Sequence, residues 1–422
     1  MQAKKYVNIP FLLICILLPS IFVVAQVHRP GDFRPNPVSL GVKAGDPFDV
    51  GTGIFYREYA DLVVDDSIPI NFVRTQRNLD PQSRSFGIGG STSYDLFIVG
   101  DVDRFSWVSL VEADGAEIRY TRISPGHSYY NGVFEDQATP GKFLGSRISW
   151  NWWHADWNIA MKDGSNLTVQ GCNAKSKPGQ CAVTEIKDKA GDRLVVERDP
   201  DGNIVRIKSP HGHVVSVTND SAGRITRIED DANHWAAYMY NAEGGLVRAQ
   251  NWRGDSQDFF YDAQWNMTRI QELGSGETGL YSWSINNTFD EQNRFKAQAL
   301  SSGEVIAVRY FTDSKNNVVQ TDVRGSEGLS QYFFNELGYE TRQEFQPTKG
   351  PGWIYQQVRD PKSNAATEAF LQCGSVKVAL PLEVEIPLGE NGEAQIAYLS
   401  AACKRAENSI PHHGKSVSPR TL

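Results

Sequence analysis

Regularly spaced turn signals in the second half of the sequence limit the folds that this chain can adopt. Seven Asp or Asn residues each open a predicted turn, and successive members lie 21, 21, 21, 28, 23 and 22 residues apart. These anchor residues are Asp199, Asp220, Asn241, Asp262, Asp290, Asp313 and Asn335. Such a period indicates a repeat architecture, in which a unit buries its apolar face only by pairing with its neighbours.

The residues within each repeat predict a β-hairpin. An Asp or Asn at the first position of a turn binds its own backbone, and Gly suits the last position of a type I turn. Gly stands three residues after four anchors, at Gly202, Gly223, Gly244 and Gly338. Alternating aliphatic residues follow, which is typical of a strand with one buried face. Since a lone hairpin is marginally stable in water, we expect the hairpins to pair into one long sheet.

The best copies resemble the Rhs or YD repeat, in which an aromatic residue and Asp are followed by two variable residues, Gly and Arg. Residues 219–228 carry the clearest copy, and residues 240–246 are close to it. Trp265 and Asn316 depart from the pattern, because they stand where Gly is expected. The resemblance implies a spiralling β-sheet shell, which in longer relatives encloses a C-terminal toxin or presents a surface for carbohydrate or protein contact.

The upstream sequence extends the resemblance to roughly residues 41–345, through segments similar to the N-terminal domain of such proteins at 46–55, 69–75 and 86–95. We therefore expect an all-β fold with an N-terminal β-rich domain followed by a spiralling antiparallel sheet of tandem β-hairpin repeats. The expected parts are a signal peptide (1–25), a linker (26–40), an N-terminal Rhs-associated β domain (41–162), the YD-repeat array (165–347) and a degenerate C-terminal extension with a disordered end (348–422). Within that extension, a short helix is possible at 394–405, and 376–386 suits at best an edge strand because of Pro381.

The N-terminus has the pattern of a signal peptide, with Lys4 and Lys5 ahead of an apolar run and cleavage expected after Ala25. The alternative is an uncleaved membrane anchor, but residues 10–25 are fewer than the roughly 20 that a spanning helix needs. The pattern favours a secreted, periplasmic or cell-surface protein, with membrane contact only through an uncleaved signal segment.

Cysteine usage agrees with export. Cys172 with Cys181, and Cys373 with Cys403, are candidate disulfides for an oxidising compartment. A zinc site is the rival interpretation, but the chain has no Cys-x-x-Cys pair, so no metal and no cofactor are expected. The formal net charge of −8 argues against nucleic acid as a partner.

Two groups of residues are candidates for binding. Arg206, Arg227, Arg248 and Arg269 recur every 21 residues and can form a ladder that grips an anionic polysaccharide. The favoured alternative is that these arginines lie on a solvent-exposed face of the sheet and form ion pairs with acids such as Glu229 and Asp230. The cluster Trp150, Trp152, Trp153 and Trp157 can stack on sugars, with Trp150 and Trp152 on one strand face and the other two on the opposite face. A core or end-plug role is the favoured alternative there.

No catalytic motif is recognisable, and neither a Gly-x-Ser-x-Gly elbow nor an autoprotease junction before a toxin domain is present. The sequence therefore predicts an exported, non-catalytic scaffold that contacts a surface polysaccharide or a partner protein, with no indication of oligomeric state. One alternative is a truncated or split component of a polymorphic-toxin system whose toxin is on another chain. A second is a carbohydrate-active enzyme, which needs a pair of carboxylates beside the Trp cluster.

Overall fold

The computed structural model describes residues 43–44, 48–80, 82–172, 178–276, 279–382 and 393–408. Its strands are antiparallel, and twenty-five of them form one sheet of consecutive hairpins, which confirms the predicted all-β fold with a hairpin array. The expected signal peptide, the linker and the end of the C-terminal extension lie outside the described residues. No helix in the described part of the chain is long and apolar enough to cross a membrane.

The large sheet begins as a small barrel. Its strands are β8 (Phe97–Gly100), β9 (Trp107–Val111), β10 (Glu117–Arg122), β11 (Val133–Asp136), β12 (Arg147–Asn151), β13 (Asp156–Ala160) and β14 (Asn166–Gln170). Phe97 forms an antiparallel bridge with Ala182, and the Val183 amide donates to the Leu96 carbonyl at 2.7 Å. These contacts close the barrel around a core that includes Phe134 and Trp157.

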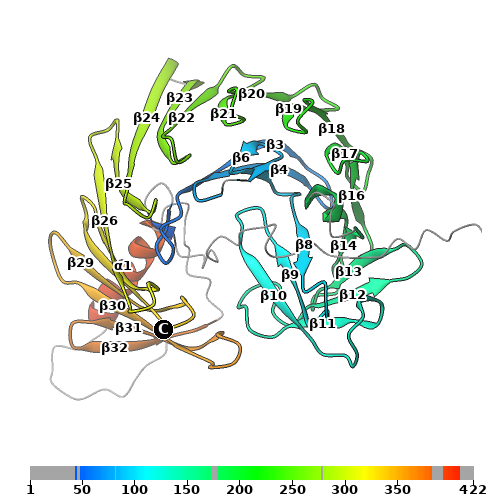
Figure 1. Ribbon diagram of the computed structural model, residues 1–422. Coiled ribbons are helices and arrows are strands. Elements are labelled where there is room, and N and C mark those ends of the chain that lie inside the picture. Colours follow the sequence, from blue (N-terminus) through cyan, green and yellow to red (C-terminus); the bar gives the residue numbers. More distant parts are fainter. Residues whose placement is uncertain are drawn as a thin grey trace, which may run out of the picture.

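The remaining strands of the sheet form the hairpin array, which curves as an arc in Figure 1. They are β15 (Val183–Lys187), β16 (Arg193–Arg198), β17 (Ile204–Lys208), β18 (Val214–Asn219), β19 (Ile225–Asp230), β20 (Trp235–Tyr240), β21 (Leu246–Asn251), β22 (Ser256–Tyr261), β23 (Met267–Gly276), β24 (Gly279–Phe289), β25 (Phe295–Leu300), β26 (Val305–Thr312), β27 (Val318–Arg324), β28 (Gly328–Phe334), β29 (Glu340–Pro347), β30 (Trp353–Arg359), β31 (Ala366–Cys373) and β32 (Val376–Leu380). Pairing thus continues for three strands beyond the predicted bound at residue 347, and β32 ends directly before Pro381.

The anchor residues make one kind of turn throughout the array. The Asp220 carboxylate accepts hydrogen bonds from the Ala222 and Arg224 amides, both at 2.9 Å. The residue three positions after each anchor has a positive φ, a conformation that favours Gly. Where Gly is missing, other residues adopt it: Trp265 (φ 63°), Asn293 (φ 60°) and Asn316 (φ 65°). The departures from the repeat pattern at Trp265 and Asn316 therefore do not interrupt the fold.

A second, three-stranded sheet lies inside the arc (Figure 1), made of β3 (Tyr56–Val64), β4 (Ile70–Arg77) and β7 (Gly90–Thr92). The short strands β1 (Lys43–Ala44), β2 (Phe48–Asp49), β5 (Ser83–Arg84) and β6 (Gly87–Ile88) complete this part. Phe48 stacks on Phe295 at 4.4 Å, and Phe86 contacts Tyr238 at 4.7 Å, both across to the array. The two sheets share one apolar core, so the first strands fill the inner face of the array.

A buried ion pair holds the inner sheet against the array. The fully buried Arg74 donates to Asp61 at 2.7 and 3.1 Å and to Gln257 at 3.1 Å. Tyr238 of the array donates its hydroxyl to the same Asp61 at 2.7 Å. The guanidinium also lies over the Tyr59 ring, 4.4 Å from its centroid. This network links β3, β4, β20 and β22.

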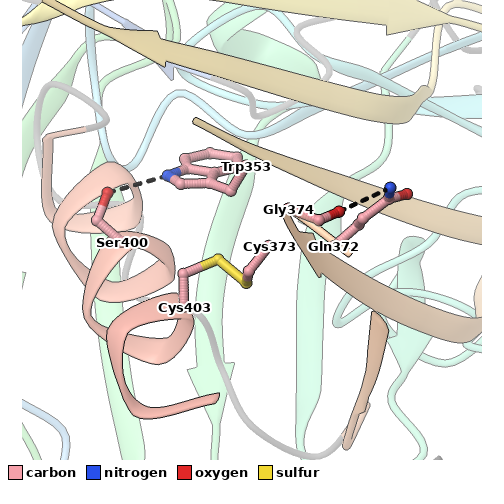
Figure 2. Close-up of a disulfide and its surroundings, with 6 residues drawn as sticks. All are labelled: Trp353, Gln372, Cys373, Gly374, Ser400 and Cys403. Carbon is pink, nitrogen blue, oxygen red and sulfur yellow. Dashed lines mark hydrogen bonds between the residues drawn. A yellow bond between two sulfur atoms is a disulfide. The ribbon is translucent and has the colours of Figure 1, made fainter. Parts of the chain in front are cut away.

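Both predicted cysteine pairs are joined as disulfides, Cys172 to Cys181 and Cys373 to Cys403. The second pair ties helix α1 (Glu393–Asn408) to β31, and Figure 2 shows the bond beside Trp353. The Trp353 indole N–H donates to Ser400 Oγ at 2.9 Å, so a hydrogen bond supports the same contact. The helix covers the last strands of the array and belongs to their apolar core; its bounds contain the predicted 394–405 segment.

We predict that Asp61→Asn lowers the free energy of unfolding by about 3–5 kcal/mol, because it leaves the buried Arg74 guanidinium without its counter-ion. A matched control is Asp258→Asn, which breaks the half-exposed pair with Arg248 (2.7 Å) and should cost about 0–1 kcal/mol. Urea unfolding followed by tryptophan fluorescence compares the two variants. Equal losses would contradict a structural role for the buried pair.

We also predict that the disulfides contribute unequally, because a cross-link stabilises more when it closes a longer loop. Cys373 and Cys403 are 30 residues apart, whereas Cys172 and Cys181 are 9 apart. Replacing Cys373 and Cys403 by Ser should lower the free energy of unfolding by roughly 3.5 kcal/mol, and replacing Cys172 and Cys181 should lower it by roughly 2.5 kcal/mol. Thermal unfolding of the two double variants tests this order; the reverse order would show that loop closure is not the main contribution.

Candidate binding site

The four tryptophans of the predicted cluster lie on the hairpin that β12 and β13 form. The predicted pairing of Trp150 with Trp152, and of Trp153 with Trp157, on common strand faces is wrong. Strand β12 ends at Asn151, so Trp152 and Trp153 stand in the turn rather than on the strand. Trp157 is buried in the barrel core, and its ring contacts that of Trp150 at 5.2 Å. Trp152 and Trp153 are instead 63% and 92% exposed. The predicted core role therefore fits Trp157, whereas Trp152 and Trp153 in the turn are exposed, as a sugar-stacking role requires.

A chain of aromatic contacts connects the barrel core to this exposed turn. Trp150 packs edge-on against Tyr129 of the 3₁₀ helix η2 (Tyr129–Asn131) at 5.4 Å. Tyr129 contacts Tyr130 at 5.7 Å, and Tyr130 contacts Trp152 at 5.5 Å. We call the exposed rings of Tyr130, Trp152 and Trp153 the aromatic platform. Sequence analysis missed the two tyrosines, although two adjacent aromatic residues in a turn-rich segment were a usable signal.

The residues that flank the two exposed tryptophans shape their turn. Asn151 Oδ1 accepts a hydrogen bond from the Trp153 amide at 3.1 Å, and Ala155 takes a positive φ of 56°. Asp156 follows, and burial raises the pKa of its carboxyl, although His154 and a hydrogen bond with Asn151 oppose that rise. The turn offers the flat apolar faces of two exposed indole rings, which suit a ligand with an apolar face of its own, such as a sugar ring.

The predicted arginine column lies on β17, β19, β21 and β23 of the array. Its contacts are Arg206 to Glu197 at 3.3 Å, Arg227 to Glu229 at 2.9 Å, Arg248 to Asp258 at 2.7 Å and Arg269 to Gln271 at 3.1 Å. Three of the four guanidiniums thus pair with acids of the array itself. Asp230, which we expected among the partners, instead contacts His234 of its own turn at 2.9 Å. The column carries little uncompensated charge for an anionic polymer.

One Ser, His and Asp come together where the turn between β3 and β4 meets the array. Asp66 accepts a hydrogen bond from Ser209 Oγ and contacts His211 Nδ1, and this contact raises the pKa of His211. The hydroxyl contacts the carboxylate, whereas a serine nucleophile needs a hydrogen bond to the imidazole. These three side chains therefore hold the β3–β4 turn against the array and do not form a catalytic triad. Across the described ranges, no group of three or more His, Cys, Asp or Glu side chains can hold a metal ion.

A pocket of about 220 Å³ lies at the junction of β5, β8 and the first repeat turns, where Arg84, Asp95 and Arg198 line it. Burial lowers the pKa of Arg198 to about 10. The Arg198 guanidinium donates to three backbone carbonyls, those of Tyr94 at 2.7 Å, Gly202 at 2.9 Å and Val183 at 3.2 Å. These contacts tie Arg198 of the array to the segment between β7 and β8.

Residues 45–120 match the family described as a domain of unknown function, DUF6531. This segment falls within the part predicted as the N-terminal domain (41–162) and includes β3, β4 and β7 of the inner sheet. No curated protein matches the chain.

Solved structures show a faint likeness. The crystal structure of TcdB2-TccC3-TEV matches with a TM-score of 0.33 and 10% identity, over 78% of this chain and 22% of that one. The N-terminal domain of effector protein SpvB from Salmonella typhimurium matches with a TM-score of 0.22 and 10% identity, over 57% of this chain and 98% of that one. A porin-like protein from Bacteroides uniformis has a TM-score of 0.22 and 12% identity, over 51% of this chain and 88% of that one. Likeness at this level carries no conclusion about function.

Proposed function

We propose that this chain is an exported, non-catalytic scaffold of the Rhs/YD-repeat kind, which binds a surface polysaccharide through its aromatic platform. The observation that carries the proposal is the 63% and 92% exposure of Trp152 and Trp153 on a hairpin whose Trp157 ring is buried. Large aromatic side chains so exposed on a fixed turn indicate a contact surface. The export part rests on the N-terminal signal pattern.

Charge favours a neutral polymer over an anionic one. The chain has a formal net charge of −8, and a negative field repels polyanions. The arginine column is the main cationic feature predicted from the repeats, and it is paired with acids at Glu197, Glu229 and Asp258. Stacking of neutral sugar rings on the platform needs no net charge.

Contacts on the inner face of the array argue against the alternative that the chain is a toxin carrier. A shell that carries cargo needs an inner face free to enclose it, whereas here the side chains of Phe48, Phe72 and Phe86 pack against that face. This occupancy favours the binding scaffold over a carrier. A split toxin component remains the second candidate, and co-purification of a toxin-like chain would support it.

The test uses the mature chain with Trp152→Ala and Trp153→Ala combined, screened on a glycan array and then titrated with the glycan that binds. We expect affinity to fall at least about tenfold, roughly 1.4 kcal/mol, because both stacking faces are lost. Trp252→Ala is the matched control, since Trp252 is also exposed but lies on the array against His234 (4.5 Å); it should bind as the parent chain does.

Three outcomes would overturn the proposal. One is glycan binding that survives the double substitution, and another is equal loss in the Trp252→Ala control. The third is release of sugars from the bound polymer that Asp156→Asn abolishes, which would establish the enzyme alternative.

A further inference from the structure

The far end of the array contacts the small barrel, so the arc closes into a ring. Asn364, in the turn between β30 and β31, donates its side-chain amide to the Ala138 carbonyl at 3.4 Å. Tyr339, which precedes β29, shares a side-chain hydrogen bond with Thr139. Ala138 and Thr139 belong to the loop between β11 and β12, at the other end of the arc in Figure 1. We call these four residues the seam.

Two buried carboxyl groups flank the seam. Asp136 is 0% exposed and Glu340 is 4% exposed. Asp136 Oδ1 accepts hydrogen bonds from the Ala138 and Thr139 amides at 3.1 and 3.0 Å, and so shapes the loop. By contrast, Asp136 Oδ2 and Glu340 Oε1 have no hydrogen-bond partner within the described residues. An ionised carboxylate is costly in such a position unless it is paired.

The surroundings of Glu340 favour its neutral form. Burial raises the pKa of Glu340 to about 7, and Arg359 of β30 opposes that rise. The Arg359 guanidinium, however, donates to the backbone carbonyls of Glu340 at 2.6 Å and Asn364 at 2.8 Å. Among the residues that the structure describes, the hydroxyls of Tyr332 on β28 and Tyr355 on β30 also interact with Glu340.

We propose that the ring opens and closes at the seam, and that the charge on the buried Glu340 side chain selects the open state. With Glu340 protonated, the seam turns stay packed on the β11–β12 loop. Once it is ionised, an unpaired charge is buried directly beside Tyr339, and separation of the seam lets water reach the carboxylate. Because the acid is more basic in the closed ring, the closed state takes up a proton, and lower pH favours it.

A distance measurement across the seam tests this proposal. Gln137 and Lys362 are exposed and flank the two sides, and the four cysteines of the described chain are in disulfides, so cysteines placed at these positions can carry spin labels. Electron paramagnetic resonance should find one short distance at about pH 5.5, and the fraction of molecules with that distance should fall by at least half at about pH 8.5. A distance distribution that does not change with pH would overturn the proposal.

Two variants separate the role of Glu340 from general loosening. Glu340→Gln keeps the side chain neutral, so the short distance should persist at both pH values, and a pH response unchanged in this variant would also overturn the proposal. Tyr339→Phe removes a seam hydrogen bond without touching Glu340, and it should lower the short-distance fraction at both pH values. Glu336→Gln, an exposed acid in the same turn, is the matched control and should behave as the parent chain.

Discussion

The hydrogen bonds that the anchor side chains accept from the backbone amides four residues later are the interaction on which the array depends. They fix the length of the turn and place its fourth residue in the left-handed region. The rest of the motif then ties one hairpin to the next. Arg224 donates to the anchor Asp220 at 2.7 Å, and its guanidinium lies 4.6 Å from the Tyr240 ring centroid in the next repeat. Tyr240 in turn donates its hydroxyl to the Ile225 carbonyl at 2.6 Å.

The same linkage explains why the array tolerates degenerate copies. Tyr261 and Tyr310 donate to the carbonyls of Leu246 and Phe295, each 15 residues earlier, as Tyr240 does. Trp265 adopts the turn conformation although it is not Gly, because its ring packs on Tyr261 at 5.5 Å. Neighbouring strands hold such a turn in place, so a missing Gly costs strain without ending the sheet.

The parts of the structure that depend on local contacts could be predicted from the sequence, and those that depend on long-range packing could not. Turn chemistry and alternation are local, so the hairpins and the all-β class could be read from spacing alone. The position of the inner sheet depends on contacts between residues far apart in the sequence, such as Arg74 and Gln257, which are 183 positions apart, and no repeat period reveals these. Arg74 nevertheless left a trace, because it shares an alternating face with Ile70 and Phe72, where an apolar residue is expected. The prediction for the tryptophans was wrong because it assumed that the strand continues through Trp152 and Trp153. Strand β12 ends at Asn151, so these two residues are exposed in the turn.

The platform and the barrel side of the seam lie at opposite ends of one strand. Strand β12 starts after the loop that carries Ala138 and Thr139, and it ends at the turn that carries Trp152. Its pairing with β13 runs over its whole length, from Arg147 opposite Ala160 to Asn151 opposite Asp156. Because that ladder is continuous, opening of the seam can move the barrel as a unit without altering the platform. Ligand affinity and ring opening are therefore expected to vary independently, and a coupling between them would have to pass through β12.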